Sequence, residues 1–114
     1  MDINCENNSG QTVIRIEGEL TIYNVSELKM QLLGQLEKPG DIELDLAKVS
    51  EIDSSAVQVF ILAKREAAQR SCSLRLVNHS PAVVDIFELY NLGSYFGDPV
   101  LMSMGSSQEQ YTRI

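Results

Sequence analysis

Short segments with strand periodicity alternate with longer segments with helical periodicity along almost the whole chain. Residues 12–18 alternate with period two, and residues 42–46 (Ile-Glu-Leu-Asp-Leu) do so most cleanly. The segments 25–36 and 55–70, which follow them, carry apolar residues at helical spacing. Because a strand, a helix and a second strand in sequence normally form a right-handed parallel unit, this order predicts an α/β fold: a small mixed, largely parallel β-sheet with helices packed on it.

Turn and capping residues predict where the elements begin and end. Asn8-Ser9-Gly10 predicts a hairpin between residues 3–7 and 12–18, and Asn24 predicts the start of a helix that Lys38-Pro39-Gly40 ends. Further along the chain we expect a connection over residues 47–52 and then a helix with Ser55 and Gln58 in a capping box. A strand over 73–77 and a helix from Ser80-Pro81 to 91–93 are expected next. A loop over 94–99 and a short strand over 100–102 follow.

The length of 114 residues suits one hydrophobic core, and 44 % hydrophobic with 22 % charged residues is typical of a globular protein. We expect one domain over residues 1–104 and a polar, mobile tail over 105–114. No apolar run reaches the roughly 18 residues of a membrane-spanning helix. The N-terminus also lacks the basic start and apolar stretch of a secretory signal. These features predict a cytoplasmic protein without membrane insertion.

The formal net charge of −7 disfavours nucleic acid and anionic membrane surfaces as partners, because both would repel the chain. The single histidine, His79, and the two cysteines, Cys5 and Cys72, show no metal-ligand spacing. In a cytoplasmic chain both thiols are expected to be free. We therefore expect no metal and no other cofactor.

Catalysis has little support in the sequence. Glu43, Asp45 and Asp53 offer carboxylates, but no nucleophile–base pair and no glycine-rich phosphate loop accompanies them. We interpret the acidic face of residues 42–46 as marking a polar site near the end of that strand. Without the convergent groups of an active site, the chain is predicted not to be an enzyme.

Asp53-Ser54-Ser55 is the first candidate site, because it lies where a strand-side loop meets the start of a helix. A helix start offers unpaired N–H groups and tolerates a phosphate, so a serine hydroxyl there can accept a phosphoryl group. The added charge would alter any binding surface that includes the site. The alternative interpretation, that the three residues only cap the helix, is the commoner role of such serines.

The helix that follows is the second candidate. One apolar stripe runs along it at helical spacing, and three further apolar residues, Val57, Ile61 and Leu62, fall outside the stripe. Either neighbouring elements cover both faces, or Val57 and Ile61 belong to an exposed docking patch beside Ser54, and the pattern alone leaves both interpretations open. The stripe comprises Ala56, Val59, Phe60, Ala63 and Ala67.

Several segments in combination resemble the STAS domain of bacterial anti-sigma factor antagonists, over roughly residues 10–101. The segments are Gly18-Glu19-Leu20, Ser26-Glu27-Leu28, residues 42–46, Ile52-Asp53-Ser54-Ser55, residues 74–83 from Leu-Arg-Leu-Val through Asn-His-Ser-Pro-Ala-Val, and Leu89-Tyr90-Asn91-Leu92. Residues 20–23, 63–68 and 96–100 look more like the stand-alone STAS proteins of chemotaxis gene clusters than like sporulation regulators.

The resemblance implies a binding protein rather than a catalyst. Its expected partners are a GHKL-type serine kinase that doubles as an anti-sigma factor and a PPM-type phosphatase. The kinase would phosphorylate Ser54 and so release the antagonist, and the phosphatase would reverse this. The resemblance also implies site neighbours at Asp53, Ser55 and Thr21 and a partner-binding surface of Ala56, Val57, Phe60 and Ile61.

Two residues depart from the pattern of the family. Ala56 stands where many members have glycine, so its methyl group is expected to hinder close approach by a kinase. Thr21 stands where many members have aspartate, which removes one acid near the phosphoacceptor.

Two other functions stay open. The domain would act as a constitutive scaffold or accessory subunit of a chemosensory array or of a lipid or anion transporter, without phosphorylation. A small-ligand sensor would instead use the carboxyl ends of the parallel strands, although no residue set points to a ligand. The sequence also leaves a homodimer open.

Overall fold

The computed structural model describes residues 1–90, which form a four-stranded sheet and three helices. In chain order these are β1 (Asp2–Asn8), β2 (Gln11–Leu20), α1 (Val25–Leu36), β3 (Asp41–Ile52), α2 (Ser54–Gln69), β4 (Leu74–Val77) and α3 (Pro81–Tyr90). The strands are ordered β1-β2-β3-β4; β1 pairs with β2 antiparallel, and the other two pairs are parallel. The predicted mixed, largely parallel α/β sheet is confirmed.

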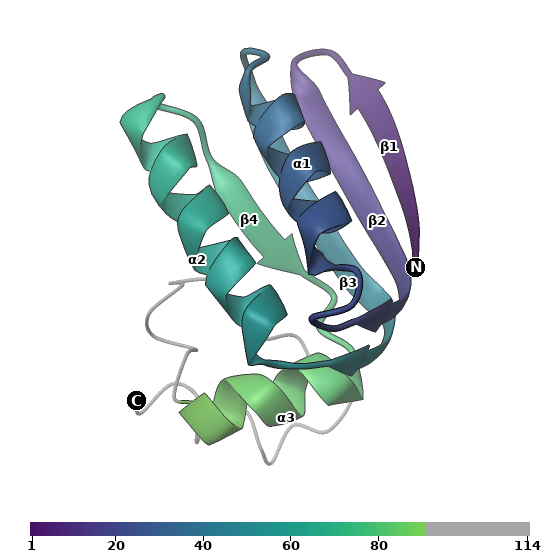
Figure 1. Ribbon diagram of the computed structural model, residues 1–114. Coiled ribbons are helices and arrows are strands. Elements are labelled where there is room, and N and C mark those ends of the chain that lie inside the picture. The colour runs from purple at the N-terminus through teal and green to yellow at the C-terminus, as the bar shows by residue number, and fades with distance from the viewer. Residues whose placement is uncertain (91–114) are drawn as a thin grey trace.

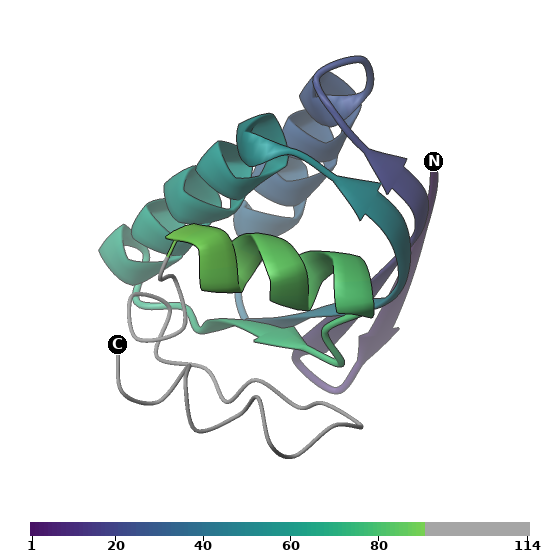
Figure 2. The same ribbon diagram turned by 90° about the horizontal axis from the view of Figure 1, so that it is seen from below.

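Two of the helices form a layer on the sheet, and the third crosses one end of the sheet. α1 and α2 lie side by side on one face of the sheet, and α3 crosses the end at which β2, β3 and β4 finish (Figures 1 and 2). Both α1 and α2 begin at that same end (Figure 1). The carboxyl ends of the parallel strands and two helix N-termini are therefore close to one another, the arrangement in which open α/β sheets usually place a site.

The core lies between the sheet and the α1–α2 layer. Every residue of the predicted α2 stripe is buried in it, which confirms the helical spacing argument. The leucines that recur in α1, the apolar residues of one sheet face and the buried residues of α3 complete this core. Fully buried examples are Leu28, Leu32, Ile14, Leu44, Leu46, Leu76 and Phe87.

The β1–β2 hairpin and the start of α3 form as predicted. Ser9 and Gly10 adopt φ values of 47° and 86°, the left-handed pair that a two-residue hairpin turn requires. Ser80 caps α3, since its hydroxyl accepts from the N–H of Val83 at 3.3 Å.

The prediction of a connection over residues 47–52 is wrong, because β3 continues to Ile52. The second half of β3 pairs with β2 after register shifts between Arg15 and Glu17 and between Gly18 and Glu19. Ala47 and Lys48 are consecutive exposed residues, so the strict alternation that identifies a strand is broken there. The extension carries the chain along β2 to the start of α2.

Gly40 joins α1 to β3 under a tight constraint. Its φ is +121°, and a Cβ at this position would overlap the carbonyl oxygen of Gly10, which accepts from the N–H of Asp41 at 3.1 Å. We expect Gly40→Ala to lower the free energy of unfolding by about 1–3 kcal/mol, because a strained φ is added to a backbone clash. Urea unfolding measures this.

Gly34 provides the control for Gly40, since it is exposed in α1 and a Cβ there would meet no atom within 4 Å. Gly34→Ala is expected to stabilise the chain by about 0.5–1 kcal/mol. Equal stability of the two alanine variants would contradict the role given to Gly40.

The predicted helix end at 91–93, the loop, the last strand and the tail all lie outside the described residues.

Candidate functional site at the start of α2

Asp53 and Ser54 lie at the junction of the sheet and α2. The N–H of Asp53 donates to the carbonyl oxygen of Leu20 at 3.1 Å, which joins the junction to the end of β2. Asp53 is the N-cap of α2 in an extended conformation, and Ser54 is the first residue of the helix. The site is therefore held by two parallel strands and a helix start, as the strand–helix pattern predicts.

Both carboxylate oxygens of Asp53 accept hydrogen bonds. Oδ1 accepts from the N–H of Ser55 at 3.0 Å and from the Ser55 hydroxyl, and Oδ2 accepts from the N–H of Ile22 at 3.0 Å. The Ser55 hydroxyl and these N–H groups hold the pKa of Asp53 below its ordinary value, so the carboxylate is ionised at neutral pH. The predicted capping box at Ser55 and Gln58 is wrong, because Asp53 caps the helix and occupies the Ser55 hydroxyl.

The two serines have different environments. Ser55 is half-buried and its hydroxyl is bound to Asp53. Ser54 is exposed, and its hydroxyl makes no hydrogen bond within residues 1–90. Of the pair, only Ser54 presents an accessible oxygen that an external phosphoryl donor could reach.

The loop of residues 21–24 lies beside Asp53 and is densely hydrogen-bonded. The N–H of Thr21 donates to Asn24 Oδ1 at 2.9 Å, and Asn24 Nδ2 donates to the carbonyl oxygen of Glu19 at 2.7 Å. The carbonyl oxygen of Thr21 accepts from the N–H groups of Asn24 and Val25, both at 3.0 Å. Asn24 occupies the predicted N-cap position of α1, but its side chain makes no capping bond and braces the loop instead.

This loop holds two large apolar side chains in solvent, and sequence reasoning did not identify them as site residues. Ile22 is 68 % exposed and Tyr23 is 94 % exposed. The sequence indicates them only weakly. Both residues stand between the end of a strand pattern and a helix cap, where neither the strand periodicity nor the helical periodicity predicts whether a side chain is buried.

The predicted partner-binding residues are mostly buried. Ala56 and Phe60 are 0 % exposed, Val57 is 5 % exposed and Ile61 is half-buried. The structure therefore favours the interpretation in which neighbouring elements cover both faces of the start of α2. We expected the methyl group of Ala56 to hinder a partner. It is buried in the core instead and does not project toward a partner.

The acidic face of β3 does not belong to this site. Glu43 accepts from Arg75 at 3.4 Å, and Asp45 lies 3.9 Å from Arg15. Both acids lie in the first half of β3, far along the strand from Asp53. The interpretation of this face as a polar site at the strand's end is wrong: the acids form cross-strand ion pairs on the sheet face opposite the core residues, and they do not converge with Asp53.

The other polar candidates stay separate from the site. His79 is 6 % exposed and packs edge-on against Phe87, with ring centroids 5.3 Å apart. Cys5 and Cys72 are both free thiols. Within residues 1–90, no group of three or more His, Cys, Asp and Glu side chains is placed to hold a metal ion. No helix of that part of the chain is long and apolar enough to cross a membrane.

The Asp53 cap has a pH-dependent effect on stability. Because its pKa is lowered in the folded state, its contribution is present at neutral pH and is lost as the pH falls below about 4, through the folded-state pKa. We expect Asp53→Ala to lower the free energy of unfolding by about 1–2 kcal/mol at pH 7 and by less at pH 3. Asp85→Ala, on the exposed side of α3, is the control. A stability difference for Asp53→Ala that is unchanged from pH 7 to pH 3 would contradict this role.

The family of the chain follows from comparison with known proteins. A family profile described as "Mlab, STAS domain" matches residues 3–102, and the chain belongs to the STAS domain family. Over 92 residues, covering 81 % of this chain and 84 % of the relative, it is 25 % identical to the anti-sigma-B factor antagonist of Bacillus subtilis.

Three further similarities link the chain to an anti-sigma factor antagonist and to a permease. The structure of unphosphorylated SpoIIAA, an anti-sigma factor antagonist, matches with a TM-score of 0.72 at 22 % identity, covering 99 % of this chain and 98 % of that one. The phosphorylated form of Bacillus SpoIIAA matches with a TM-score of 0.66, covering 95 % and 98 % at the same identity. A probable sulfate permease of Schizosaccharomyces pombe is 34 % identical in an alignment of 103 residues that covers 75 % of this chain but only 15 % of the permease.

Proposed function

We propose that this chain is an anti-sigma factor antagonist that binds a GHKL-type serine kinase and is switched by phosphorylation of Ser54. The unphosphorylated chain sequesters the kinase, which also acts as the anti-sigma factor, and phosphorylation releases it. A PPM-type phosphatase restores the binding form. The observation that carries the proposal is the exposed, unbonded hydroxyl of Ser54 at the N-terminus of α2, in a chain similar to anti-sigma factor antagonists.

The site suits phosphoryl transfer to Ser54. The hydroxyl oxygen attacks the γ-phosphorus of ATP, a new O–P bond forms, ADP leaves and the hydroxyl proton passes to a base of the kinase. The first turn of α2 directs N–H groups and a partial positive charge toward the product. In this reaction the chain is the substrate, and the catalytic groups belong to the kinase.

The product charge explains the release. A phosphoserine carries about −1.5 to −2 charges at neutral pH. It would stand directly beside the ionised Asp53, in a chain whose net charge is already −7. A partner surface that accommodates a neutral hydroxyl must then accept a strongly hydrated anion, and like charges at an interface cost several kcal/mol.

Phosphorylation in vitro tests the acceptor. The chain is incubated with its kinase and MgATP, and the product is analysed by intact mass and site mapping. We expect one phosphate, on Ser54, with none on Ser54→Ala. Ser26→Ala is the matched control, since Ser26 is also an exposed serine in the first turn of a helix. Phosphate on another residue, or none with an active kinase, would overturn the proposal.

A second candidate function has an observation in its favour. The similarity to a probable sulfate permease supports a STAS domain that serves a transporter. In that role the domain binds constitutively, so Ser54→Glu and Ser54→Ala would leave binding to a transporter subunit unchanged. A binding loss confined to Ser54→Glu would favour the phosphorylation switch. In either role, the acidic charge makes an effect on transcription indirect, through a protein partner.

A further inference from the structure

The loop of residues 21–24 has a backbone fixed by hydrogen bonds and yet exposes large apolar side chains. Its backbone is fixed by hydrogen bonds from Thr21 and Asn24, with donor–acceptor distances of 2.7–3.0 Å. Yet Ile22 and Tyr23, at 68 % and 94 % exposure, are held out in water. An ordered loop that presents apolar side chains loses little conformational entropy when a partner covers them, which is the feature of a preorganised binding contact.

The loop is connected directly to the phosphorylation site. The Asp53 carboxylate accepts from the N–H of Ile22 with one oxygen and from the N–H of Ser55 with the other, each at 3.0 Å. In the chain, Ser54 lies between Asp53, whose carboxylate accepts these hydrogen bonds, and Ser55, which donates one of them. The position of Ile22 and the environment of Ser54 therefore depend on the same side chain.

We infer that Ile22 and Tyr23 form the docking contact for the kinase partner, and that Asp53 is a positioning residue that holds this contact beside Ser54. The inference rests on the proposed function for the identity of the partner. The partner surface that fits is an apolar pocket deep enough to take an aromatic ring, because Tyr and large aliphatic residues act as anchors when they enter such pockets.

Phosphorylation would then act on the contact in two ways. An apolar pocket that closes over Ile22 and Tyr23 also removes water from the neighbouring Ser54, which a hydroxyl tolerates and a phosphate does not. The phosphate also repels the Asp53 carboxylate, which weakens its bond to the N–H of Ile22 and loosens the loop. The buried Ala56 and Phe60 cannot supply this contact, because both are 0 % exposed.

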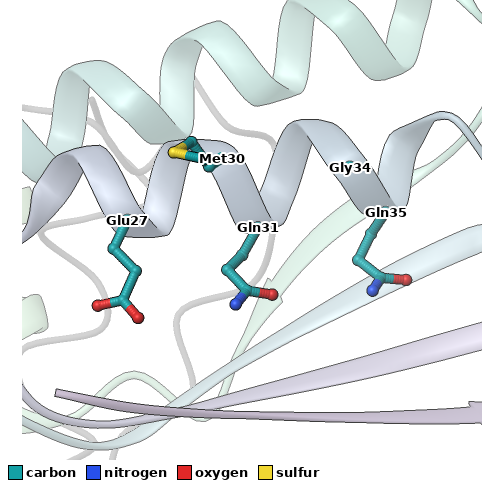
Figure 3. Close-up of a pocket in the computed structure, with 5 residues that line it drawn as sticks. All are labelled: Glu27, Met30, Gln31, Gly34 and Gln35. Carbon is teal, nitrogen blue, oxygen red and sulfur yellow. The ribbon is translucent and has the colours of Figure 1, made fainter.

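The chain offers a matched control at another exposed apolar residue. Met30 is 76 % exposed on α1, at a shallow hollow of about 550 Å³ that is lined otherwise by Glu27, Gln31, Gly34 and Gln35. Figure 3 shows the glutamate and the two glutamines projecting from α1 on the same side, with Met30 directed elsewhere on the helix. Met30 has the exposure of an anchor but no connection to Asp53.

Binding to the kinase tests the docking contact. We expect Tyr23→Ala and Ile22→Ala each to weaken binding roughly tenfold or more and Met30→Ala to change it by less than about twofold. Unchanged binding of both loop variants, with Ser54 still phosphorylated, would overturn the docking contact while leaving the proposed function intact. An absence of any binding by the wild-type chain would overturn the proposed function itself.

Amide hydrogen exchange of the isolated chain tests the positioning role without a partner. Asp53→Ala and Ser54→Glu are each expected to accelerate exchange at the Ile22 amide about tenfold or more, while the amides of β3 stay protected. Gln69→Glu, which adds one charge at the exposed far end of α2, should leave that amide unchanged. Equal protection of the Ile22 amide in all four proteins would overturn the link through Asp53.

Discussion

Ser54→Glu is expected to weaken binding of the serine kinase by roughly 10- to 100-fold, which is about 1.4–2.7 kcal/mol. Glutamate places a negative charge at the exposed first residue of α2, next to the ionised Asp53. The charge is smaller than that of phosphoserine, so the effect is a lower bound for the modified chain. Isothermal titration of the purified kinase with each variant gives the dissociation constants.

Ser54→Ala separates the loss of the hydroxyl from the gain of charge. Because the hydroxyl makes no hydrogen bond within the described residues, its removal is expected to change the binding constant by less than about threefold. Ser26→Glu adds the same charge at the first turn of α1 and serves as the second control. If Ser54→Glu bound the kinase as tightly as Ser54→Ala, charge at this position would not be the switch.

Phe60→Ala is expected to lower the free energy of unfolding by about 3–5 kcal/mol, because it leaves a cavity at one of the largest fully buried side chains. For a domain with a total stability of about 5–15 kcal/mol, the loss shifts the unfolding midpoint substantially. Tyr23→Ala is the matched control: Tyr23 is also aromatic, but it is 94 % exposed and its truncation should cost less than about 0.5 kcal/mol.

This pair of variants distinguishes a stability effect from a binding effect. A Phe60→Ala chain that binds the kinase weakly does so because part of it is unfolded, whereas Tyr23→Ala is expected to weaken binding while the chain stays folded. Urea unfolding of both variants, measured beside their kinase binding, resolves the two. A Phe60→Ala chain as stable as the wild type would show that this side chain is not a core residue.

Local periodicity predicted the architecture where one period persists. The leucines of α1 recur at helical spacing and are buried, and the left-handed Ser9-Gly10 pair forms the hairpin turn that its residue types indicate. The second half of β3 was missed because its register shifts interrupt the alternation at Ala47 and Lys48. A bulge of this kind is decided by pairing with another strand, which no local pattern contains.

The candidate site, like the fold, could be predicted only in part from the sequence. Asp53 and Ser54 could be found from the sequence, because a helix start with capping residues is a local signal. The hydrogen bond between Asp53 and the N–H of Ile22 joins residues 31 positions apart, so its effect on the loop follows only from the fold. Helical spacing likewise could not show that Val57, outside the main stripe, is also buried.

The distribution of phosphate between two cellular pools tests the switch most directly. The chain is purified from its own host as a kinase-bound pool and a free pool, and each is analysed by intact mass and site mapping. We expect phosphate on Ser54 in the free pool and an unphosphorylated chain in the kinase-bound pool. Equal phosphate on Ser54 in both pools, or a free pool without phosphate on Ser54, would contradict it.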